Sequence, residues 1–162
     1  MKFKHFQYGE EFPYRKSIGY LISAMAHIKD RVLEKHLMPL DITPAQFKVF
    51  ISMVYGKMET PAEFCRELGL DSGAMTRMLD RLEKKGLIER RRCPTDRRVV
   101  RVDLTAEGHK VADRIPNMAV DALNELFEPI SPEEFASLER ILWKIVNTAG
   151  QPNPPFGTRE ED

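Results

Sequence analysis

The sequence predicts a mainly α-helical fold that carries one small β-hairpin. Thr43, Thr60 and Ser131 each stand directly before a proline, and Gln or Glu follows two residues after that proline, which is the pattern of a capped helix start. Apolar residues recur at three-and-four spacing in long segments near both ends of the chain, as in amphipathic helices. One short segment, 100–104, alternates apolar and charged residues with the period of a half-buried strand.

The elements are expected to follow one another in a single domain over residues 15–149. The first 14 residues are expected to form an N-terminal arm, and the proline-rich segment 150–162 a flexible tail. A hairpin is predicted because Pro94-Thr95-Asp96 has turn chemistry and separates two short extended segments, 87–92 and 99–104. Helices are predicted over about 17–38, 44–55, 61–68, 72–85, 106–128 and 132–148, with Gly56, Gly69 and Gly86 as stops.

Length and composition fit one globular domain and exclude several classes of protein. The chain has 162 residues, of which 42% are hydrophobic and 31% are charged. No apolar run reaches the roughly 18 residues that span a bilayer, and no secretory leader is recognisable, so no membrane partner is expected. Two cysteines in this length do not make a disulfide framework, and we therefore expect a cytoplasmic protein.

The net charge is zero, but the charges are unevenly distributed. The 25 basic residues balance 25 acidic residues, yet the segment 75–101 contains ten Lys or Arg against four acidic residues, a local excess of +6. Neutral chains with one basic segment usually use it to bind an anionic partner. The alternative is a solvated charged face, and the charges alone do not favour either interpretation.

The segment of about 43–104 has the element order of a winged helix-turn-helix. A short helix, a Gly69-Leu70 turn and a second helix are followed by the hairpin, which would form the wing. Apolar residues cluster on one side of the second helix, and its other side has small residues at the start and cations further on. Small residues let backbone amides approach phosphate, and longer side chains reach base edges in the major groove. The predicted contacts with double-stranded DNA are Ser72, Gly73, Ala74, Thr76, Arg77, Arg81, Asp96, Arg97 and Arg98.

These residues resemble the multiple antibiotic resistance regulator (MarR) family. Asp96-Arg97-Arg98-Val99-Val100-Arg101-Val102-Asp103-Leu104-Thr105 matches the family's wing signature, Asp-x-Arg followed by five residues and Leu-Thr. Segments 70–88 and 105–108 resemble its recognition helix and the start of its long dimerisation helix, and Phe12-Pro13-Tyr14 is similar to the EmrR/MprA-like branch. The resemblance covers about residues 17–149. It implies a sequence-specific transcriptional repressor that binds a pseudo-palindromic operator as a homodimer, with Arg98 in the minor groove.

The helices outside the winged helix-turn-helix, about 15–38 and 106–148, are expected to form the dimer interface. The C-terminal ones carry more large apolar residues than one wall of a small core uses, and self-association would bury the surplus. This surplus includes Leu123, Leu126, Phe127, Leu138, Leu142 and Trp143.

The resemblance also implies a small aromatic or phenolic effector that binds between the dimerisation helices and the winged domain and weakens DNA binding. Candidate lining residues are His27 and Arg31 on the first helix, and Phe47, Phe50 and Met53 on the second. The alternative is that the Phe and Met side chains are ordinary core residues, which is common at helical spacing.

Two other functions stay open at the level of sequence. Oxidation of Cys65, before the turn, or of Cys93, at the base of the wing, would make the protein a redox sensor, and the arginines near Cys93 would favour its thiolate. A winged helix that binds a protein instead of DNA is the other alternative. No catalytic or metal-ligand pattern is recognisable around the four scattered histidines, so neither enzyme activity nor a cofactor is expected.

Overall fold

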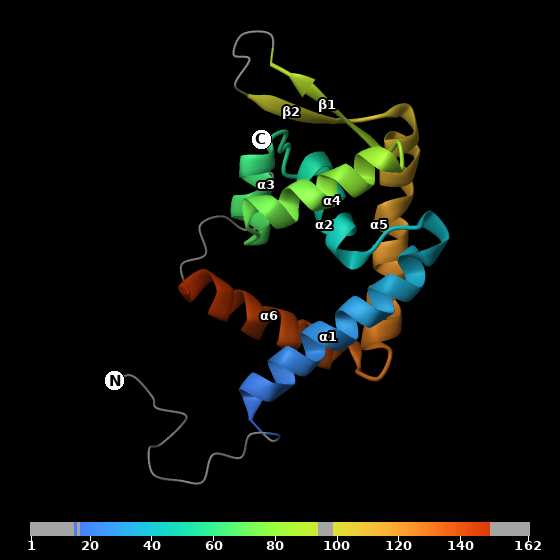
Figure 1. Cartoon of the computed structure of the whole chain (residues 1–162). Helices are drawn as coiled ribbons and strands as arrows, with labels where there is room; N and C mark the ends of the chain where they lie inside the picture. The colour runs from blue at the N-terminus through green and yellow to red at the C-terminus, as the bar shows by residue number, and fades with distance from the viewer. Residues whose placement is uncertain (1–14, 16, 94–98, 150–162) are drawn as a thin grey trace, which may run out of the picture.

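The computed structural model describes residues 15, 17–93 and 99–149 and confirms the mainly helical fold with one hairpin (Figure 1). The predicted helices and strands are all present, and their ends agree with the predictions to within one or two residues. The N-terminal arm and the tail predicted from the sequence lie outside the described residues. The elements are α1 (Ile18–Leu37), η2 (Met38–Leu40), α2 (Pro44–Val54), α3 (Pro61–Leu68), α4 (Ser72–Lys84), β1 (Ile88–Arg92), β2 (Val100–Leu104), α5 (Ala106–Phe127) and α6 (Pro132–Thr148).

The helix starts are fixed by side chains that satisfy the otherwise unpaired amides of the first turn. Complete capping boxes are present at Thr43, Thr60 and Ser131, as the repeated signature predicts. Asp71 caps α4 by accepting from the backbone N–H of Ala74, and Thr105 caps α5 in the same way. Local sequence alone therefore sets where five of the helices begin.

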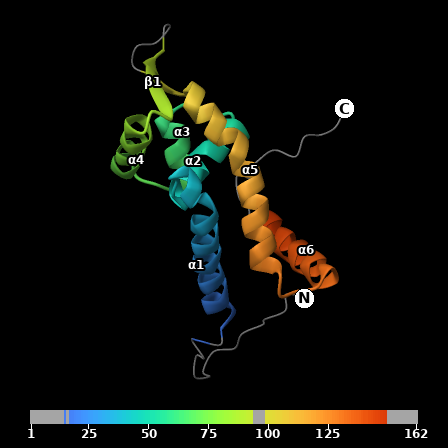
Figure 2. The ribbon, with the colours of Figure 1, turned by 90° about the vertical axis from the view of Figure 1, so that its right-hand side faces the viewer.

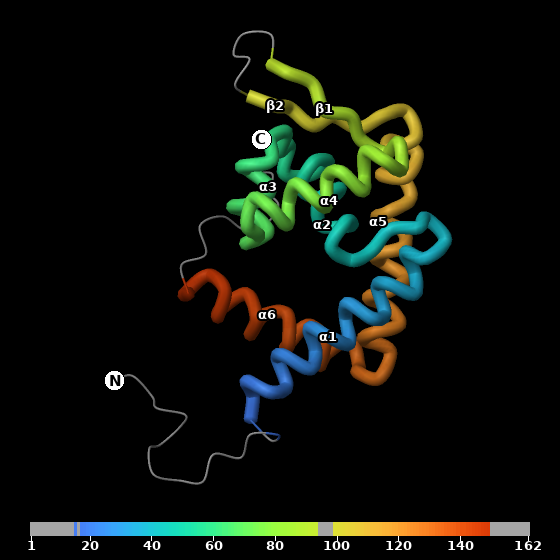
Figure 3. The backbone as a smooth tube through the Cα atoms, viewed as in Figure 1, coloured from blue at the N-terminus to red at the C-terminus, as the bar shows by residue number. Residues whose placement is uncertain are grey.

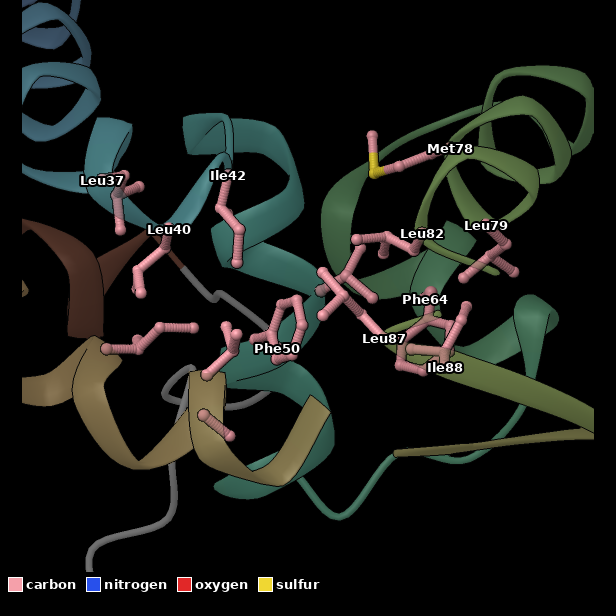
Figure 4. Packing of buried hydrophobic residues seen from close by; sticks show 14 of the residues in the cluster. Leu37, Leu40, Ile42, Phe50, Phe64, Met78, Leu79, Leu82, Leu87 and Ile88 are labelled. Atoms are coloured by element: carbon pink, nitrogen blue, oxygen red, sulfur yellow. The ribbon is translucent and has the colours of Figure 1, made fainter. Parts of the chain in front are cut away.

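The core lies where α2, α3, α4 and the hairpin meet the end of α1 and the first half of α5 (Figure 4). Phe50, Phe64, Leu82 and Ile88 are at most 2% exposed in this cluster. Each such side chain contributes roughly 1.5–3 kcal/mol by leaving water. This core holds α4 and the hairpin as one compact lobe.

The hairpin is antiparallel, and β2 is hydrogen-bonded to the segment just before α3. Ile88 pairs with Leu104 and Arg92 with Val100 in the strand register. The backbone N–H of Val102 donates to the carbonyl of Glu59, just before α3, over 2.7 Å. The wing is therefore joined to the helical lobe by backbone hydrogen bonding as well as by packing.

The helices α1, α5 and α6 project from the lobe and leave apolar surface uncovered. In Figure 2, α1 and α5 extend from the lobe in the same general direction, and α6 lies at the far end of α5. The whole length of α6 is described, and it contains no buried residue. The exposed large apolar residues of these three helices include Ile18, Leu21, Ile22, Val120, Leu123, Phe135, Ile141, Leu142, Trp143 and Ile145.

The capping carboxylate of Glu63 gives a testable dependence of stability on pH. Its Oε2 accepts from the backbone N–H groups of Glu59 and Thr60 at 3.0 and 2.9 Å, and from the Thr60 hydroxyl at 2.8 Å. The hydrogen bond from Glu59 is the largest cause that holds the pKa of Glu63 below its usual value of 4.5. A depressed carboxylate pKa contributes stability above the unfolded-state pKa, and this contribution is lost as the pH falls through the folded-state pKa.

We therefore expect Glu63→Gln to lower the melting temperature more at pH 7 than at pH 3, because the stabilising effect of the carboxylate falls as the pH drops below its unfolded-state pKa. The expected loss at pH 7 is roughly 0.5–1 kcal/mol of unfolding free energy, a typical cost for a weakened cap. Thermal unfolding of both proteins at the two pH values checks this. Glu67→Gln makes the same change of charge on α3 and is the matched control. An equal loss at both pH values would contradict the assigned role of the carboxylate.

Candidate nucleic-acid interface

The two helices of the helix-turn-helix are joined by a tight turn at Gly69. This glycine adopts the left-handed backbone conformation, with φ of 63°, and so ends α3. The conformation costs glycine little free energy because glycine has no Cβ. Leu70 and the cap residue Asp71 then lead into α4, and Figure 3 follows the backbone through this corner. The result is an α4 whose first turn is held at the surface of the lobe.

The structure confirms that α4 has one buried and one exposed face. Met75, Met78, Leu79 and Leu82 are buried in the core. Of the predicted DNA contacts, Gly73 and Ala74 are half-buried in the first turn, and the exposed ones on this helix are Ser72, Thr76, Arg77 and Arg81. The exposed face is therefore short and small at its start and cationic further on.

The first turn of α4 is ordered around the Asp71 carboxylate. The backbone N–H of Ala74 donates to it over 2.8 Å and is the largest cause that lowers the pKa of Asp71, with Arg77 as a further attractive charge. A Cβ placed on Gly73 would lie 3.4 Å from a guanidinium nitrogen of Arg77, so the Arg77 side chain folds back over this glycine. Gly73 thus leaves room for the long side chain beside it.

The hydroxyl group of Thr76 is hydrogen-bonded within α4. The hydroxyl donates to the carbonyl of Ser72 over 2.8 Å, one turn earlier. Thr76 as a residue is exposed, so its hydroxyl oxygen is left to accept a hydrogen bond from a base edge.

The hairpin lies beside α4 and one arginine connects them. A guanidinium nitrogen of Arg90 lies 2.6 Å from the Asp80 carboxylate and donates to the carbonyl of Thr76 over 3.3 Å. Glu83 lies 3.6 Å from the same guanidinium and also accepts the backbone N–H of Arg90. The predicted wing residues Asp96, Arg97 and Arg98 lie outside the described residues.

The local excess of positive charge is partly neutralised within the fold. Besides Arg90, at least three cations of the basic segment form ion pairs: Arg91 with Glu89, Arg101 with Glu59, and Lys85 with Asp41. The pairs with Glu59 and Asp41 join segments that the count of charges along the sequence does not bring together, so the +6 excess did not reveal them. The two-residue period of a strand could have indicated that Arg90 is used inside the protein, because it places Arg90 on the same face as the buried Ile88.

The structure does not bring the five predicted effector-binding residues together. His27 and Arg31 are exposed on α1, and Met53 is only partly buried. Phe50 is 1% exposed within the core cluster, as the alternative interpretation expects. Of the five, Phe47 lines a cavity of about 210 Å³ between α1, α2 and α5, together with Lys29, Leu33, Ala119, Ala122, Leu123 and Leu126.

The two cysteines differ in their exposure. Cys93 is 8% exposed directly after β1, at the loop end of the hairpin, and Cys65 is half-buried on α3. A redox-sensing cysteine is a solvent-accessible thiolate, and burial limits the access of an oxidant. No observation at either cysteine therefore favours the redox alternative over DNA binding.

Neither a metal site nor a membrane-spanning helix is found in the part of the chain that the structure describes. In residues 15, 17–93 and 99–149, no three His, Cys, Asp or Glu side chains gather as ligands for a metal ion. Within the same ranges, none of the helices has the length and hydropathy needed to cross a bilayer.

Comparisons with known proteins agree with the geometry. The MarR family model matches residues 42–100. Over 130 residues the chain is 42% identical to the multiple antibiotic resistance protein MarR of Escherichia coli, which covers 80% of this chain and 90% of that protein. It is 30% identical to the E. coli transcriptional repressor MprA over 147 residues, 88% of this chain and 82% of that one. The higher identity is to MarR, so these matches do not favour the EmrR/MprA-like branch.

A solved structure shows the same fold in a complex. A cysteine-to-serine mutant of E. coli MarR, crystallised with operator DNA, superposes with a TM-score of 0.72 and 40% identity over 83% of this chain and 99% of that chain. A relative of this identity and coverage shares family as well as fold. The chain therefore belongs to the MarR family of DNA-binding transcriptional regulators, and not to a class of enzymes.

Proposed function

We propose that this protein is a sequence-specific repressor that binds a pseudo-palindromic operator as a homodimer and is released by a small aromatic anion. The observation that carries the proposal is the exposed face of α4, small at its start and cationic further on, held beside a hairpin. A helix of this kind enters the major groove with its N-terminal part against the bases and backbone. A transcriptional regulator acts on chromosomal DNA, so the proposal places the protein in the cytoplasm.

The uncovered apolar faces of α1, α5 and α6 support the homodimer. Leu142, Trp143 and Ile145 on α6 are 48%, 46% and 58% exposed, and Ile18 and Ile22 on α1 are 55% and 60% exposed. Monomeric proteins rarely keep such contiguous apolar surface in water. A second copy with the same surface would bury it in an isologous interface and would present two α4 helices to two half-sites.

The cavity between α1, α2 and α5 supports an aromatic anion as the effector. Its walls are apolar and include the ring of Phe47, and Lys29 supplies one positive charge. Lys29 is held 2.9 Å from the carboxylate of Asp30, so an entering carboxylate would compete with Asp30 for the ammonium group. Because α1 and α5 also belong to the proposed interface, an occupant here would change the spacing of the two α4 helices.

We expect Lys29→Met to reduce the response to benzoate, used as the simplest aromatic carboxylate, by about tenfold, since a charge-assisted bond is lost. The measurement is the benzoate concentration that halves operator binding. Arg31→Met, which removes the same charge from an exposed position nearby on α1, is the matched control. A loss of response in the Arg31 variant alone would contradict the cavity assignment.

Arg77→Ala tests whether α4 reads base edges. We expect it to cost roughly 1–3 kcal/mol of operator binding and to relax the preference at one position in each half-site, because Arg77 is exposed on the face that would enter the groove. Binding to a set of duplexes with single base changes measures this. Uniform weakening on all duplexes would instead make Arg77 a phosphate contact.

The proposed function itself is tested by selection from a randomised pool of duplexes. Recovery of a near-palindrome with half-sites about one helical turn apart is the expected result. If no sequence is enriched, the result would contradict sequence-specific binding to an operator. It would then favour the interpretation of the winged helix as a protein-binding module.

A further inference from the structure

An acidic residue in the centre of the exposed face of α4 stands out among the cations that surround it. Asp80 has 54% of its side chain exposed, on the helix that the proposed function places in the major groove. A carboxylate there repels phosphate, so electrostatics alone predict that Asp80 opposes DNA binding. Its contacts indicate a different role.

The Asp80 carboxylate is bound to the wing. Arg90, on β1, approaches it to 2.6 Å, and this guanidinium has only 26% of its side chain exposed. The same guanidinium donates to the carbonyl of Thr76, so it contacts α4 at two levels one turn apart. Glu83 adds a third contact through its ion pair with the guanidinium and its bond from the backbone N–H of Arg90.

Two nitrogens of the Arg90 guanidinium are used in this cluster: one contacts Asp80 and Thr76, and the other lies 3.6 Å from Glu83. A guanidinium presents several N–H donors in a rigid plane, whereas a lysine ammonium is a single charge on a flexible stem. In the strand register Arg90 stands opposite Val102, which is buried, so its side chain is directed toward the lobe. Arg90 is therefore used inside the protein, between α4 and β1, and is not one of the cations on the outer side of the hairpin.

We infer that Asp80 and Arg90 are positioning residues that fix the angle between α4 and the wing, so that an acidic residue promotes operator binding. A helix in the major groove and a wing beside it engage the same duplex only when their relative orientation is right. The clamp of Asp80, Thr76 and Glu83 on Arg90 sets that orientation before DNA arrives, and preorganisation of this kind lowers the cost of binding. The inference rests on the proposed function and assigns a role to a residue that contacts protein rather than DNA.

Two variants separate positioning from simple charge effects. Asp80→Asn makes the protein more positive, yet we expect it to weaken binding to the selected operator duplex by about tenfold. Arg90→Lys keeps the net charge, and we expect a loss in the same direction because a single ammonium nitrogen cannot hold Asp80 and Thr76 and also lie beside Glu83, which a second guanidinium nitrogen does in Arg90. Binding of both variants to a scrambled duplex of the same composition is expected to stay unchanged or to tighten, so the ratio of the two affinities is the readout.

The double variant Asp80→Asn/Arg90→Lys completes the test. If the two residues act through one another, it binds the operator about as weakly as the weaker single variant. Glu89→Gln is the matched control, because it also removes one negative charge from the same region but pairs with Arg91 on the outer side of the hairpin. We expect this control to leave operator discrimination unchanged. Circular dichroism and thermal unfolding confirm that each variant is folded.

Several results would overturn the inference. Operator binding that tightens in Asp80→Asn would show that Asp80 only repels DNA. Strictly additive losses would show two independent contacts, and wild-type operator affinity of Arg90→Lys would show that Arg90 merely neutralises Asp80, because lysine keeps the positive charge. Wild-type protein that fails to discriminate the selected duplex from the scrambled one would contradict the proposed function as well, whereas wild-type discrimination that survives Asp80→Asn overturns this inference alone.

Discussion

Replacing Leu142 with aspartate is expected to convert the proposed dimer to monomers and to weaken operator binding at least about 100-fold, because one duplex then no longer binds two linked copies of the chain. Leu142 lies 48% exposed on α6, beside Trp143 and among other apolar side chains. A carboxylate at this position would have to be buried without a partner when two copies associate, which is strongly unfavourable. Sedimentation velocity and operator binding measure the two effects.

The control for Leu142 is on the same helix. Arg140 is two residues away, and two residues of an α-helix turn the side chain to the opposite side. Arg140→Gln makes the same change of net charge as Leu142→Asp. We expect it to remain dimeric, and a dimer that survives Leu142→Asp would place the interface elsewhere.

Gly108→Ala is expected to have the largest effect on stability, a loss of about 3 kcal/mol or more of unfolding free energy. Gly108 lies in the first turn of α5, where the helix crosses the start of the hairpin. A Cβ there would overlap the backbone carbonyl oxygen of Leu87, which also accepts the N–H of Thr105. Since the obstacle is backbone and not the end of a flexible side chain, α5 and the hairpin must separate.

Denaturation by urea at a fixed protein concentration measures this loss, because the stability of the proposed dimer would depend on the protein concentration. Gly19→Ala in α1 is the control, since the nearest atom to its new Cβ is 3.9 Å away. That variant is expected to be neutral or to gain up to about 1 kcal/mol through helix propensity. Equal effects of the two substitutions would contradict the close approach at Gly108.

The fold was predictable because its signals are local. Three helices begin at capping boxes whose contacts lie within four residues, at Thr43, Thr60 and Ser131. The alternation of apolar and charged residues from Val100 to Leu104 indicates which face of the strand is buried. The division of α4 into a buried and an exposed face follows from the same periodicity. These parts of the candidate site required no knowledge of the tertiary structure.

The parts that were missed depend on contacts between distant segments. Arg90 and Asp80 are ten residues apart and meet only because the hairpin returns beside α4. The cavity that contains Phe47 takes its charge from Lys29, whose place depends on how α1 packs on α2 and α5. Sequence patterns identify Phe50 and Phe47 as apolar, but the packing decides that Phe50 belongs to the core and Phe47 to the cavity wall.

The central claim is that two copies of this chain read one near-palindromic duplex through α4 and the wing. The most direct measurement is the mass of the complex formed on the selected duplex by sedimentation, repeated at several salt concentrations. We predict two chains on each duplex, with the logarithm of the binding constant falling with the logarithm of salt by about 0.9 for each phosphate neutralised. A single chain on each duplex, or an affinity that does not change with salt, would contradict the account.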